Sequence, residues 1–297
     1  MKSIKNIIVT ISALALLASC ERNDETAISQ IDNQNGIKVV ELSKTDTFQG
    51  NELGIYGLEF SGMQDITLRN KITKYRYSDD VKEHLSSYAI TKEVSDLGRF
   101  DQISFGEIGF EKTNKMMEPK FLKQYRAKNG VGIKEKVAEV SETMFGKEQK
   151  FSLRTDSYEI NESAYIPELI DIDNAGTFDE TINRYTASRG GLSISYNVDA
   201  KNESGVALLL LWDGTTKDMS MQELASMNME YKNKIVVFDP NDSGVLNVPQ
   251  YALSKFPKNA NLTMVLMRNN AKLIEKSGKK HYLVTGSEQY ERVTILD

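Results

Sequence analysis

The second half of the chain alternates between short apolar segments and polar turn sequences. Eight segments of this half have the length and apolar content of β-strands. Helical patterns between them are few and short, which favours an antiparallel two-layer β-sandwich over a parallel sheet. The eight predicted strands are Ala164–Ile172, Leu192–Tyr196, Val206–Trp212, Lys234–Asp239, Val245–Val248, Leu262–Arg268, Lys280–Thr285 and Arg292–Leu296.

Two of these segments indicate which faces of their strands are covered. Apolar and serine residues alternate in Leu192–Tyr196, as in a strand with one buried face. Val206–Trp212 is apolar throughout, which predicts a strand covered on both faces. Turn sequences separate the strands, at Arg189–Gly191, Asn202–Gly205, Asn241–Gly244 and Asn269-Asn270.

The first half predicts a mixture of strands and helices. Segments with strand patterns are Ile37–Leu42, Leu53–Phe60, Asp65–Tyr77, Ile103–Phe105 and Ile108–Phe110. Residues 79–90 predict a short helix after Ser78, and Pro119 predicts a second helix over 119–127. The apolar spacing of Ile133, Val137 and Val140 fits a helix, with a strand as the alternative.

Residues 1–19 have the three-part pattern of an export signal. Lys2 and Lys5 supply a positive start, and a mainly apolar stretch of 12 residues follows from Ile7 to Ala18. This stretch is too short for a dedicated transmembrane helix, which needs about 20 apolar residues. The pattern ends in a branched residue, two small residues and a cysteine: Leu17-Ala18-Ser19-Cys20.

This tetrad resembles the lipobox of bacterial lipoproteins. The resemblance implies a diacylglyceryl group on the Cys20 sulfur, cleavage before Cys20, and acylation of the new N-terminus by a fatty acid such as palmitate. Several acyl chains anchor a protein to a membrane far more strongly than one. The alternative is an ordinary secretory signal that has a cysteine near its cleavage site by coincidence.

Residues 20–36 are polar and predict a flexible tether. Its acidic start, Glu21–Glu25, resembles the export signal of surface lipoproteins in Bacteroidota. A solvated run of charges is the alternative. In either case the anchor would hold the protein at the outer membrane, facing the cell surface under the first interpretation and either side under the second.

The segment from Ile166 to Asp297 resembles the immunoglobulin-like or fibronectin-like β-sandwich domains of Bacteroidota envelope lipoproteins of unknown function. The similarity lies in Leu192–Asn197, Asn202–Leu211, Asp242–Pro249 and Leu262–Arg268. The predicted organisation is therefore a signal peptide (1–19), a tether (20–36), a mixed β/α region (37–160) and an immunoglobulin-like sandwich (161–297). The expected fold class is mainly β.

Composition narrows the classes of function. The formal net charge is −5, and removal of Lys2 and Lys5 makes it −7, so no basic surplus suggests a nucleic-acid partner. One Cys excludes an intrachain disulfide and a cysteine-based zinc cluster. The chain has no Gly-rich phosphate loop and no G-x-S-x-G elbow. We therefore expect no cofactor, no metal and no catalytic residue.

The individual candidates for chemistry each have a plain structural interpretation. The only two histidines, His84 and His281, lie beside lysines, so we expect both at the surface. Acidic pairs at Asp79-Asp80 and at Asp171 with Asp173 could support glycoside hydrolysis, although 42 acidic residues make such pairs common by chance.

Three further segments could bind a ligand. Asp239–Gly244 partly resembles a calcium loop, but a polar turn between strands fits better because no helices flank it. Trp212 could stack on a sugar, although packing in the core is the better interpretation. Met219, Met221, Met227 and Met229 could form an adaptable surface or fill gaps.

Ser220–Glu223 predicts a capping box at the start of a short helix.

Three functions remain after these exclusions. The favoured one is a lipid-anchored envelope lipoprotein, not an enzyme, with a binding, adhesion or scaffold role toward a protein or glycan. The alternative is a carbohydrate-active protein, either a glycan binder or a carboxylate-dependent glycoside hydrolase. The third is a structural subunit of a larger envelope complex.

Overall fold

The computed structural model describes residues 36–41, 66–77, 80–89, 100–112, 117–120, 133–220, 222–223 and 233–297. Strands dominate these residues, so the predicted mainly β fold class is confirmed. The elements are β1 (Lys38–Glu41), β2 (Ile66–Tyr77), β3 (Asp80–Ala89), β4 (Phe100–Phe105), β5 (Ile108–Lys112), β6 (Met117–Pro119), α4 (Ile133–Met144), β7 (Lys147–Thr155), β8 (Glu159–Ile166), β9 (Ile172–Asn174), β10 (Thr177–Asp179), β11 (Arg184–Ser188), β12 (Leu192–Tyr196), β13 (Val206–Thr216), β14 (Asn233–Asp239), β15 (Val245–Val248), α6 (Gln250–Leu253), β16 (Ala260–Lys276) and β17 (Lys279–Leu296).

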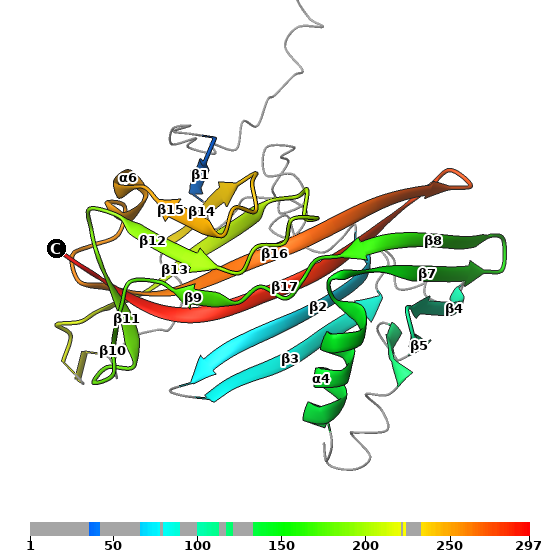
Figure 1. Cartoon of the computed structure of the whole chain (residues 1–297), viewed down its shortest axis with the longest axis horizontal. Coiled ribbons are helices and arrows are strands. Elements are labelled where there is room, and N and C mark those ends of the chain that lie inside the picture. The colour runs from blue at the N-terminus through cyan, green and yellow to red at the C-terminus, as the bar shows by residue number, and fades with distance from the viewer. Residues whose placement is uncertain are drawn as a thin grey trace, which may run out of the picture.

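Strands β9 to β17 build a two-layer sandwich (Figure 1). A small sheet in the order β15-β12-β9 packs against β14, β13, β16 and β17 of the large sheet, and the buried residues of both sheets form one hydrophobic core. With β9, β12 and β15 as strands A, B and E, and with β13, β16 and β17 as C, F and G, the neighbours are those of immunoglobulin-like sandwiches. Strand β1 pairs antiparallel with β14 and extends the large sheet at its edge.

Strand β13 shows why this part of the sequence is so apolar. Leu208 and Leu210 point into the core between the two sheets. Ala207 and Leu211 point to the opposite face, where they pack with Val236 and neighbouring residues in a second apolar cluster. Burial on both faces requires apolar residues at every position, so the prediction for Val206–Trp212 is confirmed.

The large sheet continues beyond β17 in the order β2-β3-β6-β5-β4-β7-β8. We call β2 to β8 together with α4 the curled region, because its last strand, β8, returns to the side of β16. There the side chains of Asn270 and Lys272 on β16 donate hydrogen bonds to backbone oxygens of Tyr165 and Ser163 on β8. A second core lies inside this curl, formed by Val140 and Met144 of α4 with Phe105, Phe151 and Leu153, among others.

The hairpin of β16 and β17 joins the sandwich to the curled region (Figure 1). Its turn is Ser277-Gly278, and positive φ values of 52° and 72° at the two residues are those of a type I′ turn. Along its other edge β17 pairs in parallel with β2 and, nearer its end, with β11. Ile274 and Leu283, near the turn, belong to the core of the curled region.

The structure corrects several sequence predictions. The helix expected over 79–90 is strand β3, so a mixed β/α region is not supported. Residues 133–144 form the helix α4, in agreement with the first of two alternatives. The boundary at residue 160 falls inside β8, which is paired with β7. Leu53–Phe60 and most of 119–127 lie outside the described residues.

One misassignment concerns the two longest strands. Asn269-Asn270, expected as a turn, lies within β16, and the two strands expected at 280–285 and 292–296 are one strand, β17. The intervening sequence Gly286–Glu291 is polar, which is why it looked like a loop. Ser287, Glu288, Gln289 and Glu291 in this sequence are buried. Ser287 and Gln289 have partners in a distant segment: the Ser287 hydroxyl accepts a hydrogen bond from the Ile170 amide at 2.7 Å, and Gln289 Oε1 accepts one from the Ile172 amide at 3.0 Å.

Candidate functional site

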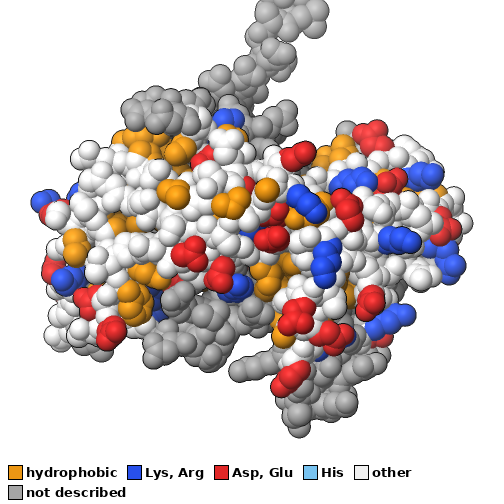
Figure 2. Space-filling view, viewed as in Figure 1, with side chains coloured by type: hydrophobic (Ala, Val, Ile, Leu, Met, Phe, Trp, Pro, Cys, Tyr) orange, Lys and Arg blue, Asp and Glu red, His pale blue; other side chains and the backbone are white. Residues whose placement is uncertain are grey.

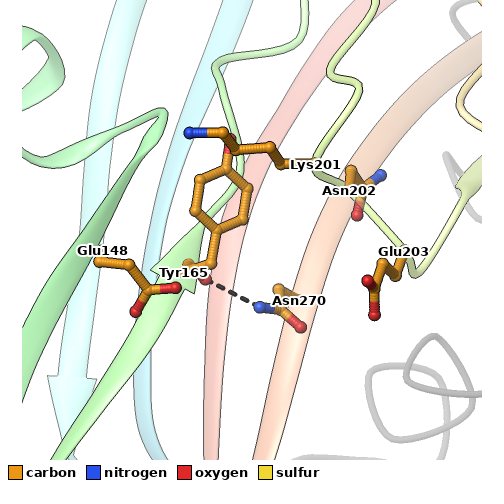
Figure 3. Close-up of a pocket in the computed structure, with 6 residues that line it drawn as sticks. All are labelled: Glu148, Tyr165, Lys201, Asn202, Glu203 and Asn270. Atoms are coloured by element: carbon orange, nitrogen blue, oxygen red, sulfur yellow. Dashed lines mark hydrogen bonds between the residues drawn. The ribbon is translucent and has the colours of Figure 1, made fainter.

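A polar pocket of about 260 Å³ lies where β7 and β8 meet the sandwich (Figure 3). Three segments that are distant in the sequence form its walls: the two strands, the loop between β12 and β13, and the middle of β16. Its lining residues are Glu148, Tyr165, Lys201, Asn202, Glu203 and Asn270. We call this site the polar pocket.

Asp199 holds the two sides of the polar pocket together. Its carboxylate accepts hydrogen bonds from the Tyr165 hydroxyl at 2.9 and 3.0 Å. It also accepts from the backbone amides of Glu168 and Lys201, at 2.8 and 3.0 Å. Because Asp199 is itself buried, these contacts fix the loop between β12 and β13 against the end of β8.

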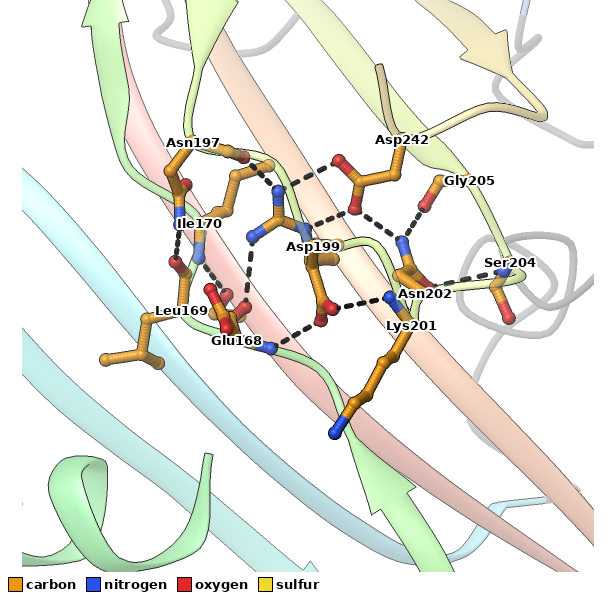
Figure 4. A network of polar contacts seen from close by, with 12 residues as sticks. Glu168, Leu169, Ile170, Asn197, Asp199, Lys201, Asn202, Ser204, Gly205 and Asp242 are labelled. Carbon is orange, nitrogen blue, oxygen red and sulfur yellow. Dashed lines mark hydrogen bonds and ion pairs between the residues drawn. The ribbon is translucent and has the colours of Figure 1, made fainter. Parts of the chain in front are cut away.

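A buried ion pair is connected to the same loop by hydrogen bonds (Figure 4). Arg268 on β16 contacts Asp242 through Nε at 2.6 Å and Nη2 at 2.9 Å, and both side chains are almost fully buried. The guanidinium also donates to the backbone oxygens of Glu168 and Asn197. Asn202 donates to Asp242 at 2.9 Å, which connects the ion pair to the wall of the pocket. We call these residues the Arg268 network.

Burial also changes the acidity of two tyrosines near these contacts. Burial, together with the hydrogen bond to Asp199, raises the pKa of Tyr165 well above its usual value. Burial and the nearby Asp242 carboxylate raise the pKa of Tyr196 to about 12. Both phenols are therefore protonated at neutral pH and can only act as hydrogen-bonding groups.

The pocket offers groups for binding a small polar molecule. Glu148 and Glu203 supply carboxylates, and both side chains are exposed to solvent. The ammonium group of Lys201 lies 5.8 Å from the centre of the Tyr165 ring, which places a cation beside the aromatic surface. Within the described residues, no group of three His, Cys, Asp or Glu side chains is placed to hold a metal ion.

The candidate calcium loop Asp239–Gly244 is the polar turn between β14 and β15 that the sequence favours. Asp239 caps the turn by accepting a hydrogen bond from the Asn241 amide at 2.8 Å. Asp242 is committed to Arg268. The carboxylates of Asp239 and Asp242 therefore both have partners within the protein.

The expectation of a surface position is wrong for His281. His281 is 5% exposed, and its Nε2 lies 2.9 Å from the hydroxyl of Tyr158. Tyr158 lies in the turn between β7 and β8. The sequence could not indicate this contact because the two residues are far apart in the chain. His84 lies on β3, opposite Thr73 of β2, and its side chain is outside the described residues.

The other candidates among the described residues do not line the polar pocket. Asp171 and Asp173 are exposed, and Asp171 lies 3.6 Å from Lys74. Trp212 is partly buried against the sandwich core and donates to the Thr215 backbone oxygen at 2.9 Å. Met219 is half-buried. Cys20, Asp79, the Asp80 side chain and the remaining methionines of that set are outside the described residues.

The predicted capping box is present. The Ser220 hydroxyl contacts Glu223 at 2.7 Å, and the Glu223 carboxylate accepts a hydrogen bond from the Ser220 amide at 2.7 Å. These bonds lower the pKa of Glu223.

Sequence reasoning missed the residues that build the pocket. Tyr165 and Arg268 lay in predicted strands, where nothing marked them as functional, and Glu148 lay in a segment without a prediction. One local signal was available: Arg268 is a charged residue directly after the apolar run Leu262–Met267. A charged residue on a buried strand needs a partner, so a search for nearby acidic turns could have suggested Asp242.

No protein-family model and no curated protein matches the chain. Domains 4 and 5 of the S-layer protein SbsC align with 69% of this chain and 81% of their own, at 6% identity and a TM-score of 0.15. Domains 4–9 of the surface layer protein SbsC align with 77% of this chain and 47% of their own, at 9% identity and a TM-score of 0.13. Such low TM-scores do not establish a shared fold.

Proposed function

We propose that this protein is an outer-membrane lipoprotein, anchored through acyl chains on Cys20, with a non-catalytic binding, adhesion or scaffold role. The observation that carries the proposal is the tetrad Leu17-Ala18-Ser19-Cys20 at the end of a short apolar segment with a positive start. Cys20 is the only cysteine of the chain. A thiol at this position is suited to alkylation by a lipid.

The arrangement of the described residues is compatible with a body held on a tether. The polar residues 20–36 lead directly to β1, which lies at the edge of the large sheet. Within the described ranges, the model contains no helix that combines the length and apolar character needed to span a bilayer. The acyl chains would thus supply the attachment in this proposal.

The commitments of the ionisable side chains support a role without catalysis. Arg268 and Asp242 form a buried pair, Asp199 holds Tyr165, and His281 contacts Tyr158. Each of these contacts connects segments that are distant in the sequence. They therefore have structural roles that account for their burial.

The anchor is tested by replacing Cys20 with Ala and following labelled fatty acid and membrane fractionation. We expect loss of the label and accumulation of an unprocessed precursor. The matched control, Ser19→Ala, keeps a small residue before Cys20 and should be acylated normally. Recovery of mature, membrane-extracted protein with an unmodified Cys20 would falsify the proposal.

A glycan ligand is the second candidate, and the polar pocket favours it. Sugars are bound by carboxylates and carboxamides that exchange hydrogen bonds with hydroxyl groups, next to an aromatic ring. Glu203, Asn270 and Tyr165 offer these groups in one pocket. A volume of about 260 Å³ is small for a ligand site and fits one sugar unit or a chain end.

A glycan array followed by calorimetry tests this candidate. We expect Glu203→Gln to weaken binding at least tenfold and Glu162→Gln, an exposed change on β8 outside the pocket, to leave it unchanged. Release of reducing sugar that is lost in Glu148→Gln or Glu203→Gln would instead identify a hydrolase. If no glycan binds, the binding role must belong to another ligand.

A further inference from the structure

Three reactive side chains are buried on adjacent strands of the large sheet. Lys71 on β2 is 1% exposed, Glu288 on β17 is 8% exposed, and Asn269 on β16 is 0% exposed. None of them belongs to the polar pocket or to the Arg268 network. A buried lysine is rare because removing its charge from water is costly.

The register of the sheet places Lys71 and Asn269 on one line across β17. Gly286 of β17 is the direct partner of Lys71 on one side and of Asn269 on the other. Directly paired residues point to the same face of a sheet, so both side chains share a face. Their backbones are two strand spacings apart, or about 10 Å, which a lysine and an asparagine side chain can together bridge.

The side chains of Lys71 and Asn269 are both directed toward β17, the strand between them. A Cβ atom at Gly286 would lie only 2.4 Å from Asn269 Oδ1, so the carboxamide occupies the space above the glycine. From the other side, Lys71 on β2 extends to the neighbouring β17, where its Nζ contacts Glu288 Oε2 at 2.6 Å. Glu288 is two residues from Gly286 and therefore lies on the same face. The absence of a side chain at Gly286 leaves room for this approach.

The carboxyl group of Glu288 is held in place. Its Oε1 accepts a hydrogen bond from the Thr73 hydroxyl at 2.7 Å, while Oε2 contacts Lys71. An amine, a carboxamide and an oriented carboxyl group are the three parts needed to form an amide bond between side chains. The nucleophile in such a reaction is the neutral amine, and the Glu288 carboxyl group lies close enough to Lys71 Nζ to take up its proton.

We propose that Lys71 and Asn269 form an intramolecular isopeptide bond, with Glu288 as the catalytic residue. Glu288 accepts a proton from the Lys71 ammonium, and Nζ attacks Cγ of Asn269. The carboxyl group then passes a proton from Nζ to the carboxamide nitrogen. The C–N bond to that nitrogen breaks, and ammonia departs with the remaining proton as ammonium. One C–N bond forms and one breaks, so no oxidant or reductant is required.

The bond connects the two parts of the molecule. It links β2, the first strand of the curled region, to β16 of the sandwich and crosses β17 without involving its backbone. It also closes a long loop of chain, which restricts the unfolded state. For a protein exposed at an envelope, such a bond resists pulling and proteolysis in a way that hydrogen bonds between strands do not.

Peptide mapping of the purified full-length protein by mass spectrometry tests the proposal. We expect a branched peptide that joins the Lys71 and Asn269 segments and is lighter by one ammonia than the two linear peptides together. We also expect the linear forms to be missing. Complete recovery of both linear peptides, or conversion of Asn269 to aspartate without a link, would overturn the proposal.

Variants identify the role of Glu288. Glu288→Gln keeps the size of the side chain but cannot accept the proton, so the linear peptides should be recovered in full from folded protein. Glu275→Gln, an exposed change on β16, should leave the branched peptide at its wild-type amount. A branched peptide that persists in folded Glu288→Gln would remove the catalytic role from Glu288. If Glu288→Gln does not fold, the wild-type peptide map alone decides whether the bond exists.

Discussion

The sandwich and the curled region share one sheet but bury its strands differently. In the sandwich, β13 is covered on both faces and is apolar at nearly every position. In the curled region, β7 buries Phe151, Leu153 and Thr155 and exposes most of the residues between and before them. The first pattern is recognisable in the sequence, whereas the second was missed.

The surfaces reflect the same difference. Figure 2 shows acidic and basic side chains interspersed over β7, β8 and α4 more densely than over the sandwich. A strand with one exposed face carries charges that hide its strand character in a single sequence. The comparison teaches that burial on two faces, more than strand propensity, makes a strand predictable.

The largest effect is expected at the contact between the two regions. Replacing Arg268 with Met removes the guanidinium that donates to the buried Asp242 carboxylate and to two backbone oxygens. We expect the free energy of unfolding to fall by about 3–5 kcal/mol in chemical denaturation. Arg292→Met, an exposed change on β17, should stay within about 0.5 kcal/mol of wild type. A loss below about 1 kcal/mol for Arg268→Met would show that the Arg268 network contributes little to stability.

Matched core substitutions test whether the two regions unfold together. Leu210 in the sandwich and Leu153 in the curled region are both 0% exposed. Each change to Ala should lower the free energy of unfolding by about 2–5 kcal/mol. Because the hairpin of β16 and β17 joins the two regions, we expect one shared transition by fluorescence and by circular dichroism. Two separate transitions, each sensitive to only one variant, would contradict a single cooperative unit.

A smaller loss of unfolding free energy is expected where the turn between β7 and β8 contacts β17. Tyr158→Phe removes the hydrogen bond to His281 and should lower the free energy of unfolding by about 1 kcal/mol. His281→Gln tests the other partner. Combined in a double-mutant cycle, the two changes should show coupling. Fully additive losses would mean that the contact between the two side chains contributes nothing.

The smallest change in the free energy of unfolding at neutral pH is expected at Tyr196, which lies in the sandwich. The pKa of Tyr196 is raised to about 12 in the folded protein, chiefly by burial, against an ordinary value near 10. Between these two values the unfolded chain releases the proton while the folded chain retains it. Tyr196 therefore makes the stability fall as the pH rises from about 10 to about 12.

Phenolate absorbance and denaturation at several alkaline pH values measure this dependence. We expect Tyr196→Phe to reduce the loss of stability over this range and to have no pH-dependent effect near neutrality. Tyr165, whose pKa is also raised, should retain its own contribution. An unchanged alkaline profile in Tyr196→Phe would show that Tyr196 is not titrating in this window.

The fold of the sandwich was more predictable than any part of the candidate site. Strands β12 and β15 have the predicted bounds, and three of the four turn sequences are turns. The prediction of a turn at the fourth, Asn269-Asn270, was wrong, because these residues pair with Gly286 and Thr285 of β17 in a continuous strand. Gly286 has no side chain, which leaves room for the buried Asn269 carboxamide. For the pocket, the sequence could not show that Glu148, Lys201 and Asn270 meet, since each comes from a different element.

The sequence by itself determined the features that depend on neighbours in the chain. The apolar periodicity of the sandwich strands and the capping box at Ser220 and Glu223 follow from side chains a few residues apart. The tertiary structure alone decided which polar groups could be buried. Arg268 lies inside because Asp242 meets it, and Lys71 lies inside because Glu288 does. Burying a charge is costly without such a partner, and only the folded chain brings the partners together.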